Sequence, residues 1–387
     1  MSASAGSPLL VCPLTRQPLR LLSLAQACAE LAPGRSLRPS RTRGPRLVGQ
    51  TPFVLLRADA ALAYPVVDGI PVLLAPEALA VEPALDAIPA QAEAAADPKP
   101  AGAPSRERRY AEAYAEMAHY NAVAAAHQRS LKASAVAASV APALEADARA
   151  RGRFPDPPAR WLDLLYDLPA QYSAYRHLAP LAGKRLLQAG GSGVQAVILL
   201  LAGAAEAWVA SPMLDELRLA MALAAHAGVS ERLRCVAAIG EELPFAAGSF
   251  DGIFCPGSLH HMDTAAALPE FFRVLACGGR FAACEPWRAP LYGIGTRIFG
   301  KVEQGVHCEV FTAPRLQMLF RTFPGARVEH HGTLTRYPLV ALQKLGLRPS
   351  RRVSWPLARL DDAVCARLPW LREQGSSLAI LGTRGDV

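Results

Sequence analysis

A regular alternation of short apolar runs with helix-length segments, beginning near residue 185, constrains the fold of this chain most strongly. The runs RLLQA, AWVAS, LRCVAA, GIFCPG and GRFAACEP have the composition of buried strands, and segments long enough for helices or loops separate them. Such alternation predicts a parallel, doubly wound α/β sheet. The later runs RVEHHGTLTR and SSLAILGTR would add two terminal strands. We therefore expect a mostly parallel seven-stranded sheet in which at least one terminal strand is a candidate for antiparallel pairing.

The first of these strands leads directly into a glycine-rich turn, LLQAGGSGVQA, over residues 186–196. In doubly wound sheets, ligands bind outside the carboxyl ends of the strands, where the strand order reverses. Glycine permits positive φ and close approach of the backbone to a ligand, and a serine hydroxyl can donate a hydrogen bond. We therefore expect ligand contacts at Gly190, Gly191, Ser192 and Gly193, although glycine in a tight βα turn can also serve the fold alone.

The chain is long enough for more than one folding unit. It has 387 residues, whereas single hydrophobic cores stop growing at roughly 250–300 residues. Residues 1–75 are rich in strand and turn signals and end in AYPVVDGIPVLL, which is typical of a hairpin with an Asp-Gly turn. Residues 76–106 have the Ala, Pro, Glu and Asp composition of a linker. We predict a small β-rich module, this linker, a helical region over 107–180 and the main sheet domain over 181–387.

The helical region carries a stripe of large side chains. Tyr110, Tyr114, Met117 and Tyr120 recur at helical spacing on one face. Core packing is the ordinary meaning of such a stripe, and a lid over a substrate pocket is the alternative.

Charge and cysteine content indicate the cellular setting only broadly. The net charge is +8, and a solvated basic face is the simplest interpretation; nucleic acid, anionic lipid or an acidic partner are alternatives. Eight cysteines without any CxxC pair suit reduced, mostly buried thiols in a cytosolic protein. The first residues lack the pattern of a signal peptide. We expect a cytoplasmic protein whose most apolar window, residues 193–210, is a buried helix and strand rather than a membrane span.

Two later segments resemble a known family. EELPFAAGSFDGIFCPGSLHHM and FFRVLACGGRFAACEPWR resemble the ubiquinone/menaquinone C-methyltransferase-like group of class I S-adenosylmethionine-dependent methyltransferases. The landmarks LPF, SFD, LHHM and RVLxxGGR occur in the family's order over roughly residues 185–290. The resemblance implies a methyltransferase-type sheet that binds S-adenosylmethionine. The contacts that it implies fall at Gln188, Gly190, Gly191, Ser192, Gly193, Val209, Ile239, Gly240, Glu241 and Gly257.

The N-terminal module has a resemblance of its own. VCPLTRQPL and YPVVDGIPVLL are similar to segments of the small zinc-ribbon-like proteins that act as activating partners of methyltransferases. This implies a partner-like unit fused to its enzyme. A structural zinc site needs four ligands, whereas Cys12 stands alone because Thr15 occupies the usual second cysteine position and no pair precedes Tyr64. We therefore expect a module without zinc.

The chain departs from the family pattern at three carboxylates. Gln188 stands where the family has an acid before the glycine turn, and Val209 or Ala210 stands where an acid binds the ribose hydroxyls. The third position, near the adenine, is Ile239. Each lost charge-assisted hydrogen bond weakens binding by on the order of 1.5–3 kcal/mol. Groups that could compensate are backbone amides, Ser192, Asp215, Glu216 and Glu241.

Candidate reactive groups follow the strands of the sheet. His260 and His261 come after the fourth strand, where a general base would belong, because imidazole titrates near neutral pH. Glu285 could orient a substrate or cap the following turn.

Metal and thiol chemistry have weaker support. His307-Cys308 and His330-His331 are ligand-type residues, but no spacing predicts a metal site. Cys255, Cys277 and Cys284 lie in apolar strand positions, where buried thiols are inert.

These observations favour methyl transfer from S-adenosylmethionine to a small-molecule or natural-product acceptor, through an atypical cofactor pocket. The alternative is an inactive pseudo-methyltransferase that serves as a scaffold or regulator of a protein partner through the N-terminal module. RNA modification is a third hypothesis, which lacks an RNA-reading motif.

Overall fold

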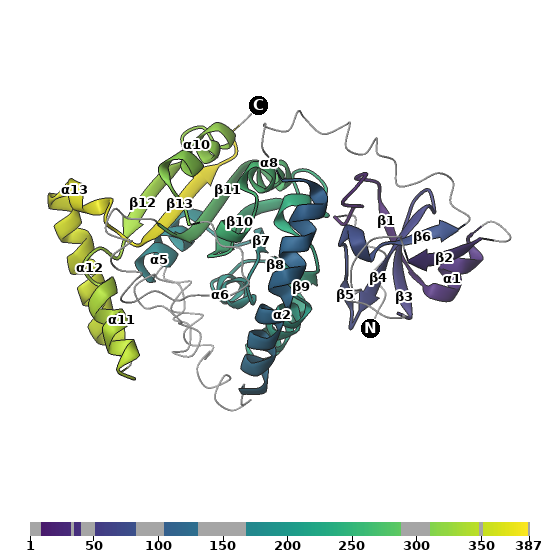
Figure 1. Cartoon of the computed structure of the whole chain (residues 1–387), viewed down its shortest axis with the longest axis horizontal. Helices are drawn as coiled ribbons and strands as arrows, with labels where there is room; N and C mark the ends of the chain where they lie inside the picture. The colour runs from purple at the N-terminus through teal and green to yellow at the C-terminus, as the bar shows by residue number, and fades with distance from the viewer. Residues whose placement is uncertain are drawn as a thin grey trace.

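The computed structural model describes residues 9–31, 35–39, 51–82, 104–130, 168–287, 310–347 and 351–385. Figure 1 shows a small β-rich module beside a larger α/β domain, with the long helix α2 (Arg106–Ser130) lying across that domain on the side nearer the module. Part of the predicted helical region, residues 131–167, lies outside the described residues.

The large domain is built on a seven-stranded sheet with the order β12-β13-β11-β10-β7-β8-β9. Strands β7 to β11 pair in parallel, whereas β13 is antiparallel to both β11 and β12. The seven predicted strands are therefore present in a mixed sheet whose order reverses beside β7. The strands are β7 (Arg185–Ala189), β8 (Glu206–Ala210), β9 (Leu233–Val236), β10 (Phe250–Pro256), β11 (Leu275–Pro286), β12 (Arg327–His331) and β13 (Ser377–Thr383).

Helices cover both faces of this sheet, because successive side chains of each strand point to opposite faces. Leu186 of β7 belongs to the core that includes α5, α6 and α7, whereas Leu187 belongs to the core on the α8 and α10 side. The helices are α5 (Leu168–Leu178), α6 (Val194–Leu201), α7 (Leu214–His226), α8 (Thr264–Val274), α10 (Ala313–Thr322), α11 (Arg336–Lys344), α12 (Arg351–Arg367) and α13 (Pro369–Arg372). Short 3₁₀ turns are η5 (Ser230–Arg232), η6 (Gly240–Glu242) and η7 (Leu259–His261).

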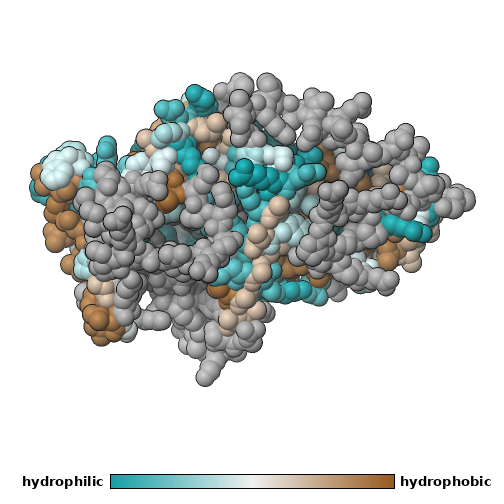
Figure 2. All heavy atoms as spheres, in the orientation of Figure 1, coloured by the Kyte–Doolittle hydropathy of each residue, from teal (hydrophilic) through white to brown (hydrophobic). Residues whose placement is uncertain are grey.

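The apolar window at residues 193–210 forms the buried helix α6 and strand β8, as predicted. Among the described residues, no helix combines the length and the hydropathy needed to cross a bilayer. Figure 2 shows hydrophobic side chains over α11, α12 and α13, at the end of the molecule opposite the module. The most exposed of them are Leu345, Leu347, Leu360 and Trp370.

The N-terminal module is a six-stranded antiparallel sheet with the order β1-β3-β4-β6-β2, and β5 pairs with β4. The predicted hairpin is confirmed: β4 and β5 are joined at Asp68 and Gly69, whose φ angles are +50° and +79°. Its elements are β1 (Leu19–Ser23), α1 (Leu24–Ala29), β2 (Ser36–Pro39), β3 (Phe53–Arg57), β4 (Leu62–Val67), β5 (Ile70–Pro71), η1 (Ala75–Glu77) and β6 (Leu79–Glu82).

The predicted start of the linker at residue 76 is wrong, because η1 and β6 continue the module to Glu82. Strand β6 pairs with β2 and β4, and Val81 is buried. The averaged Ala, Pro and Glu composition hid the short apolar run LAVE, which the sheet needs as a partner for two other strands. The rest of the predicted linker, up to residue 103, lies outside the described residues.

The module docks on the β9 edge of the large sheet through backbone hydrogen bonds. The N–H of Ala237 donates to the carbonyl of Pro71 at 2.8 Å, and the N–H of Leu73 donates to the carbonyl of Ala237 at 2.8 Å. Asp68 forms an ion pair with Arg218 of α7. The chain that follows β9 is therefore held on one side by the module.

Cys12, the lone cysteine of the partner-like motif, contacts Tyr64. The sulfur of Cys12 lies 3.2 Å from the hydroxyl oxygen of Tyr64, and both residues are buried. In the part of the chain that the structure describes, no group of three or more His, Cys, Asp or Glu side chains could hold a metal ion.

Candidate functional site

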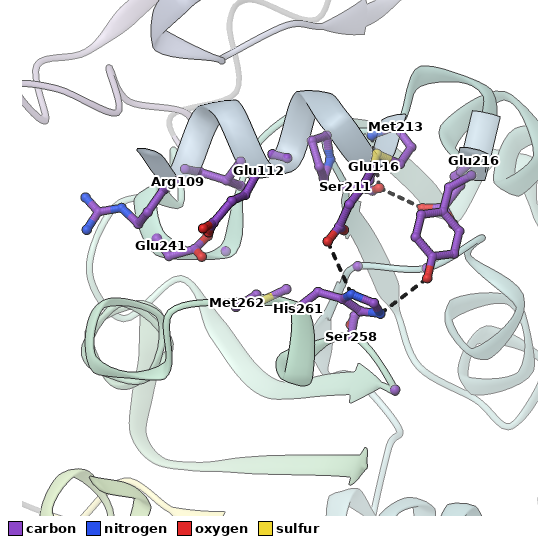
Figure 3. Close-up of a pocket in the computed structure, with 18 of the residues that line it drawn as sticks. Arg109, Glu112, Glu116, Ser211, Met213, Glu216, Glu241, Ser258, His261 and Met262 are labelled. Atoms are coloured by element: carbon purple, nitrogen blue, oxygen red, sulfur yellow. Dashed lines mark hydrogen bonds and ion pairs between the residues drawn. The ribbon is translucent and has the colours of Figure 1, made fainter. Parts of the chain in front are cut away.

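A pocket opens at the carboxyl ends of β7, β8 and β10, beneath helix α2 (Figure 3). Its empty volume is about 730 Å³, including space open to solvent. The position agrees with the switch point expected from the strand order. The lining residues are Arg109, Glu112, Ala113, Glu116 and Tyr120 of α2, with Gly190, Gly191, Ser211, Pro212, Met213, Glu216, Ile239, Gly240, Glu241, Pro256, Gly257, Ser258, His261 and Met262.

The glycine-rich turn has the backbone that only glycine adopts readily. Gly190, Gly191 and Gly193 have φ angles of +81°, +73° and +77°. A Cβ at Gly190 would lie 2.4 Å from the Ser258 hydroxyl oxygen, so this glycine is also required by close packing. Gly190 and Gly191 line the pocket, whereas Ser192 and Gly193 do not. Gly193 instead allows α6 to approach α7, because a Cβ there would lie 2.3 Å from that of Ala220.

Gln188 holds the turn together from within the core. Its side-chain nitrogen Nε2 donates to the carbonyl of Gly190 at 2.9 Å, and its oxygen Oε1 accepts from the N–H of Ala196 at 2.7 Å. The Ala196 N–H belongs to the first turn of α6, where no intrahelical acceptor exists. The amide thus caps the helix and ties it to the turn, and Gln188 does not line the pocket.

The carboxylate beside the end of β8 belongs to the next helix, α7. Val209 is buried in the core and does not line the pocket. The hydroxyl of Ser211 donates to Oε2 of Glu216 at 2.8 Å, and Glu216 lines the pocket. Burial raises the pKa of Glu216 to about 7, and the bond from Ser211 offsets only part of that shift. The adjacent Asp215 pairs instead with Arg218 at 2.7 Å, outside the pocket.

A second half-buried carboxylate lies beyond β9. Ile239, Gly240 and Glu241 all line the pocket. Glu241 accepts a hydrogen bond from the N–H of Asp263 at 2.9 Å, and burial raises its pKa to about 7. A Cβ at Gly240 would lie 2.5 Å from the sulfur of Met262, so these two residues are closely packed in the pocket wall.

The two neighbouring histidines have different surroundings. His261 lines the pocket, with Nδ1 3.4 Å from Oε1 of Glu116 and Nε2 3.3 Å from the hydroxyl of Tyr120 (Figure 3). His260 does not line it, and its Nδ1 lies 2.7 Å from Oε2 of Glu285.

Glu285 does not line the pocket, and its carboxylate instead holds the turn after β10. It is buried and accepts hydrogen bonds from the N–H groups of Leu259 and His260 at 2.8 and 3.2 Å. It therefore caps the turn after β10, which precedes it in the chain, and not the turn that follows it, which was one of the two roles expected for it.

Helix α2 supplies pocket residues that the sequence analysis missed. Arg109, Glu112, Glu116 and Tyr120 recur at helical spacing and line the pocket, so the polar stripe of this helix is the signal that indicates them. Figure 3 shows Glu116 extending from α2 toward His261. The aromatic stripe divides: Tyr110 and Met117 are buried in the core, whereas Tyr120 reaches the pocket. Core packing is therefore confirmed for Tyr110 and Met117, and a lid over a substrate remains a prediction for Tyr120.

The remaining candidates lie elsewhere. His307 and Cys308 are outside the described residues. The ring of His330 packs against Trp287, and His331 bonds Asp362 at 2.9 Å.

The cysteines need one correction. Cys277 is exposed and not buried, because it lies near the start of the long strand β11, whereas Cys255 and Cys284 are buried as expected. Burial raises the pKa of the Cys255 thiol well above its ordinary value.

Comparison with known proteins agrees with this geometry. A family model described as a methyltransferase domain matches residues 187–283, about a quarter of the chain, running from β7 into β11. This stretch holds the glycine turn, the pocket carboxylates Glu216 and Glu241, and both histidines. It supports an α/β methyltransferase fold for this part of the chain. No curated protein matches the sequence.

Similar solved structures include several methyltransferases. Geranyl diphosphate C-methyltransferase from Streptomyces coelicolor A3(2), in complex with Mg²⁺, a substrate analogue and S-adenosyl-L-homocysteine, is 15% identical, with a TM-score of 0.41 over 56% of this chain and 75% of that one. Phosphoethanolamine N-methyltransferase 2 from Haemonchus contortus, with S-adenosyl-L-methionine, is 14% identical, with a TM-score of 0.40 over 55% and 52%. YcgJ from Bacillus subtilis is 19% identical, with a TM-score of 0.38 over 58% and 99%. Likenesses at this level carry no functional argument.

Proposed function

We propose that this chain is an S-adenosylmethionine-dependent methyltransferase that acts on a small-molecule or natural-product acceptor. The observation that carries the proposal is the pocket itself: the glycine turn at the switch point and the two half-buried carboxylates Glu216 and Glu241 line it, within the region that matches the methyltransferase domain model. The C-methyltransferase-like group and the fused activating-partner module are the finer parts of the proposal, and they rest on the sequence motifs.

The residues of the pocket fit the cofactor in shape. A Cβ at Gly190 would lie 2.4 Å from Ser258 and one at Gly240 would lie 2.5 Å from Met262, so a side chain at either position would displace the pocket wall. Close approach of backbone to ligand is the use that phosphate- and cofactor-binding loops make of glycine. In this proposal Gly190, Gly191 and Gly257 contact the methionine portion, and Ile239 to Glu241 form the adenine side.

The residues also fit the cofactor in charge. Four carboxylates line the pocket, against Arg109 and His261 as the basic side chains of the lining. Oε1 of Glu116 is buried without a hydrogen bond, and its contact with His261 at 3.4 Å is an ion pair only when that ring is protonated. Such a site favours a cationic ligand. When bound, S-adenosylmethionine supplies a methyl group on a sulfonium, which is already activated for transfer. The four carboxylates are Glu112, Glu116, Glu216 and Glu241.

Within this proposal His261, and not His260, is the candidate general base. Its ring is held between a carboxylate and a phenol of α2, an arrangement that fixes the ring plane and supports a proton on Nδ1. Alignment of donor and acceptor supplies most of the rate in such transfers, and a base adds to it when the acceptor must lose a proton. Helix α2 would then serve as the lid that orients the base.

The second candidate function is a scaffold that keeps the fold without the chemistry. The observation in its favour is the replacement of the three family carboxylates by Gln188, Val209 and Ile239. In that case the N-terminal module would contact the protein partner.

Calorimetric titration with S-adenosylmethionine and S-adenosylhomocysteine separates the two functions. The enzyme proposal predicts binding tighter than about 100 μM for each ligand, weakened at least tenfold in Gly190→Arg. Gly183→Arg is the matched control, because Gly183 has a similar φ of +76° but no atom within 4 Å of its Cβ position. Absence of heat at millimolar ligand with the wild-type protein would reject the enzyme proposal and favour the scaffold.

A further inference from the structure

We infer that Glu216 is the acceptor of the ribose hydroxyls in this pocket, and that it replaces, from helix α7, the carboxylate that strand β8 lacks. The inference rests on the proposed function, since it names a contact with S-adenosylmethionine. It concerns a residue that lies seven positions beyond Val209 in the chain.

The geometry brings Glu216 back to the end of β8. The strand ends at Ala210, and the next residue, Ser211, donates its hydroxyl to Oε2 of Glu216 at 2.8 Å (Figure 3). The same hydroxyl oxygen accepts from the N–H of Met213 at 3.2 Å, so Ser211 is fixed from both sides. The carboxylate is thereby held beside the strand end although it belongs to the helix.

One oxygen of this carboxylate remains free for a ligand. Within the described part of the chain, Oε1 of Glu216 has no hydrogen-bond partner, and the residue lines the pocket. An ionised carboxylate offers about four acceptor positions on its two oxygens, of which Ser211 uses one. Two adjacent hydroxyl groups are the ligand chemistry that matches the rest. Burial raises the pKa of Glu216 to about 7, as expected of a carboxylate whose protein partners do not satisfy it.

The neighbouring carboxylates are committed elsewhere. Asp215 pairs with Arg218, which also pairs with Asp68 of the module. Glu241 lies on the far wall, where it accepts from the N–H of Asp263. Glu116 faces His261. Among the pocket carboxylates, Glu216 is therefore the one beside the end of β8.

A purely structural role for Glu216 makes a different prediction. A carboxylate in the first turn of a helix can stabilise the helix through the macrodipole and the unpaired N–H groups. In that role, loss of its charge would lower stability and would leave discrimination between ligands with and without ribose hydroxyls unchanged.

The test is calorimetric titration with S-adenosylhomocysteine and with its 2′-deoxy and 3′-deoxy analogues, on wild type, Glu216→Gln and the control Asp215→Asn. The inference predicts that wild type and Asp215→Asn bind each deoxy analogue about 10-fold or more weakly than the parent ligand. Glu216→Gln should bind the parent about 10- to 100-fold more weakly than wild type and bind all three ligands with nearly equal affinity.

Failure of the inference and failure of the proposed function look different in this design. If Glu216→Gln binds the parent ligand as wild type does, or retains the preference for both hydroxyls, the inference is wrong while the proposed function stands. If wild type itself does not bind the parent ligand, both are wrong. A thermal unfolding curve of each variant shows that the protein titrated is folded.

Discussion

The two sides of the pocket use polar side chains in opposite ways. On the β7 side, Gln188 is buried, and both its nitrogen and its oxygen are hydrogen-bonded inside the protein. On the β8 and β9 side, Glu216 and Glu241 are half-buried carboxylates with raised pKa values, and few protein donors reach them. A satisfied amide stabilises the fold, whereas a desolvated carboxylate with few hydrogen-bond donors destabilises it. We therefore propose that the first side serves the fold and the second side binds the cofactor.

The largest effect is expected at Gly190, which is closely packed against Ser258 and also lines the pocket. Gly190→Val places a branched side chain at a φ of +81° and a Cβ 2.4 Å from Ser258. We expect loss of several kcal/mol of stability, from strain and overpacking together, and no detectable binding of S-adenosylhomocysteine. Chemical denaturation and calorimetry measure the two effects. The control Gly183→Val has the strained φ without the contact, and an equal loss there would refute the role of close packing.

The second test removes the amide that ties the turn to α6. Gln188→Leu leaves the N–H of Ala196 and the carbonyl of Gly190 without their partner, at a cost of about 1–3 kcal/mol for each buried group that stays unsatisfied. Affinity for S-adenosylhomocysteine should fall together with stability, because the glycine turn is no longer held in one conformation. Gln188→Glu should also destabilise, since a carboxylate would face the Gly190 carbonyl without a donor. A gain in affinity with Glu at unchanged stability would show that position 188 contacts the ligand directly.

The third test separates the two histidines. His260→Gln disturbs the ring partner of the buried Glu285 and should lower stability by about 1–3 kcal/mol, as read from denaturant unfolding. His261→Gln should leave stability within about 0.5 kcal/mol and lower the rate of methyl transfer once an acceptor is known. The reverse pattern, a stable His260→Gln protein and an unstable His261→Gln protein, would exchange their roles.

The smallest effect is a pH dependence of stability. Glu216 and Glu241 have pKa values of about 7 in the folded protein, above the ordinary 4.5. Between these values the folded state binds more protons than the unfolded chain, so their contribution to stability falls as the pH rises from about 4.5 to 7. Replacement of either residue by Gln should therefore stabilise the ligand-free protein by about 1 kcal/mol at pH 8, with the gain shrinking toward pH 5. Equal effects at both pH values would contradict the raised pKa values.

Much of the main domain could be predicted from the sequence because its signals are local. Strand β7, the glycine turn and helix α6 follow one another without interruption, and apolar alternation identifies each strand of the sheet. The order of the strands and the switch point then follow from general rules for α/β folds. The same reasoning placed Gly190 and Gly191 at the pocket, whereas Gly240 and Gly257 were expected there from the family resemblance.

The rest of the site depends on contacts between distant segments. Glu116 meets His261 only because α2 crosses the ends of the strands, and no local pattern predicts where a helix before the sheet will dock. Gln188 shows the other limit: its neighbours in the chain suggest a ligand contact, whereas the folded turn uses both of its polar atoms. Residues 79–82 were assigned to the linker because composition averages over a strand of four residues.

The most direct test of the account is to measure stability and affinity together in Glu216→Gln at pH 8. The account predicts that the ligand-free variant unfolds at higher denaturant concentration than wild type, while its affinity for S-adenosylhomocysteine falls about 10- to 100-fold. Stability rises and affinity falls together only if the Glu216 carboxylate binds the ligand and destabilises the ligand-free fold. If stability and affinity both fall, as expected for Gln188→Leu, Glu216 is a structural residue and the distinction between the two sides of the pocket is wrong.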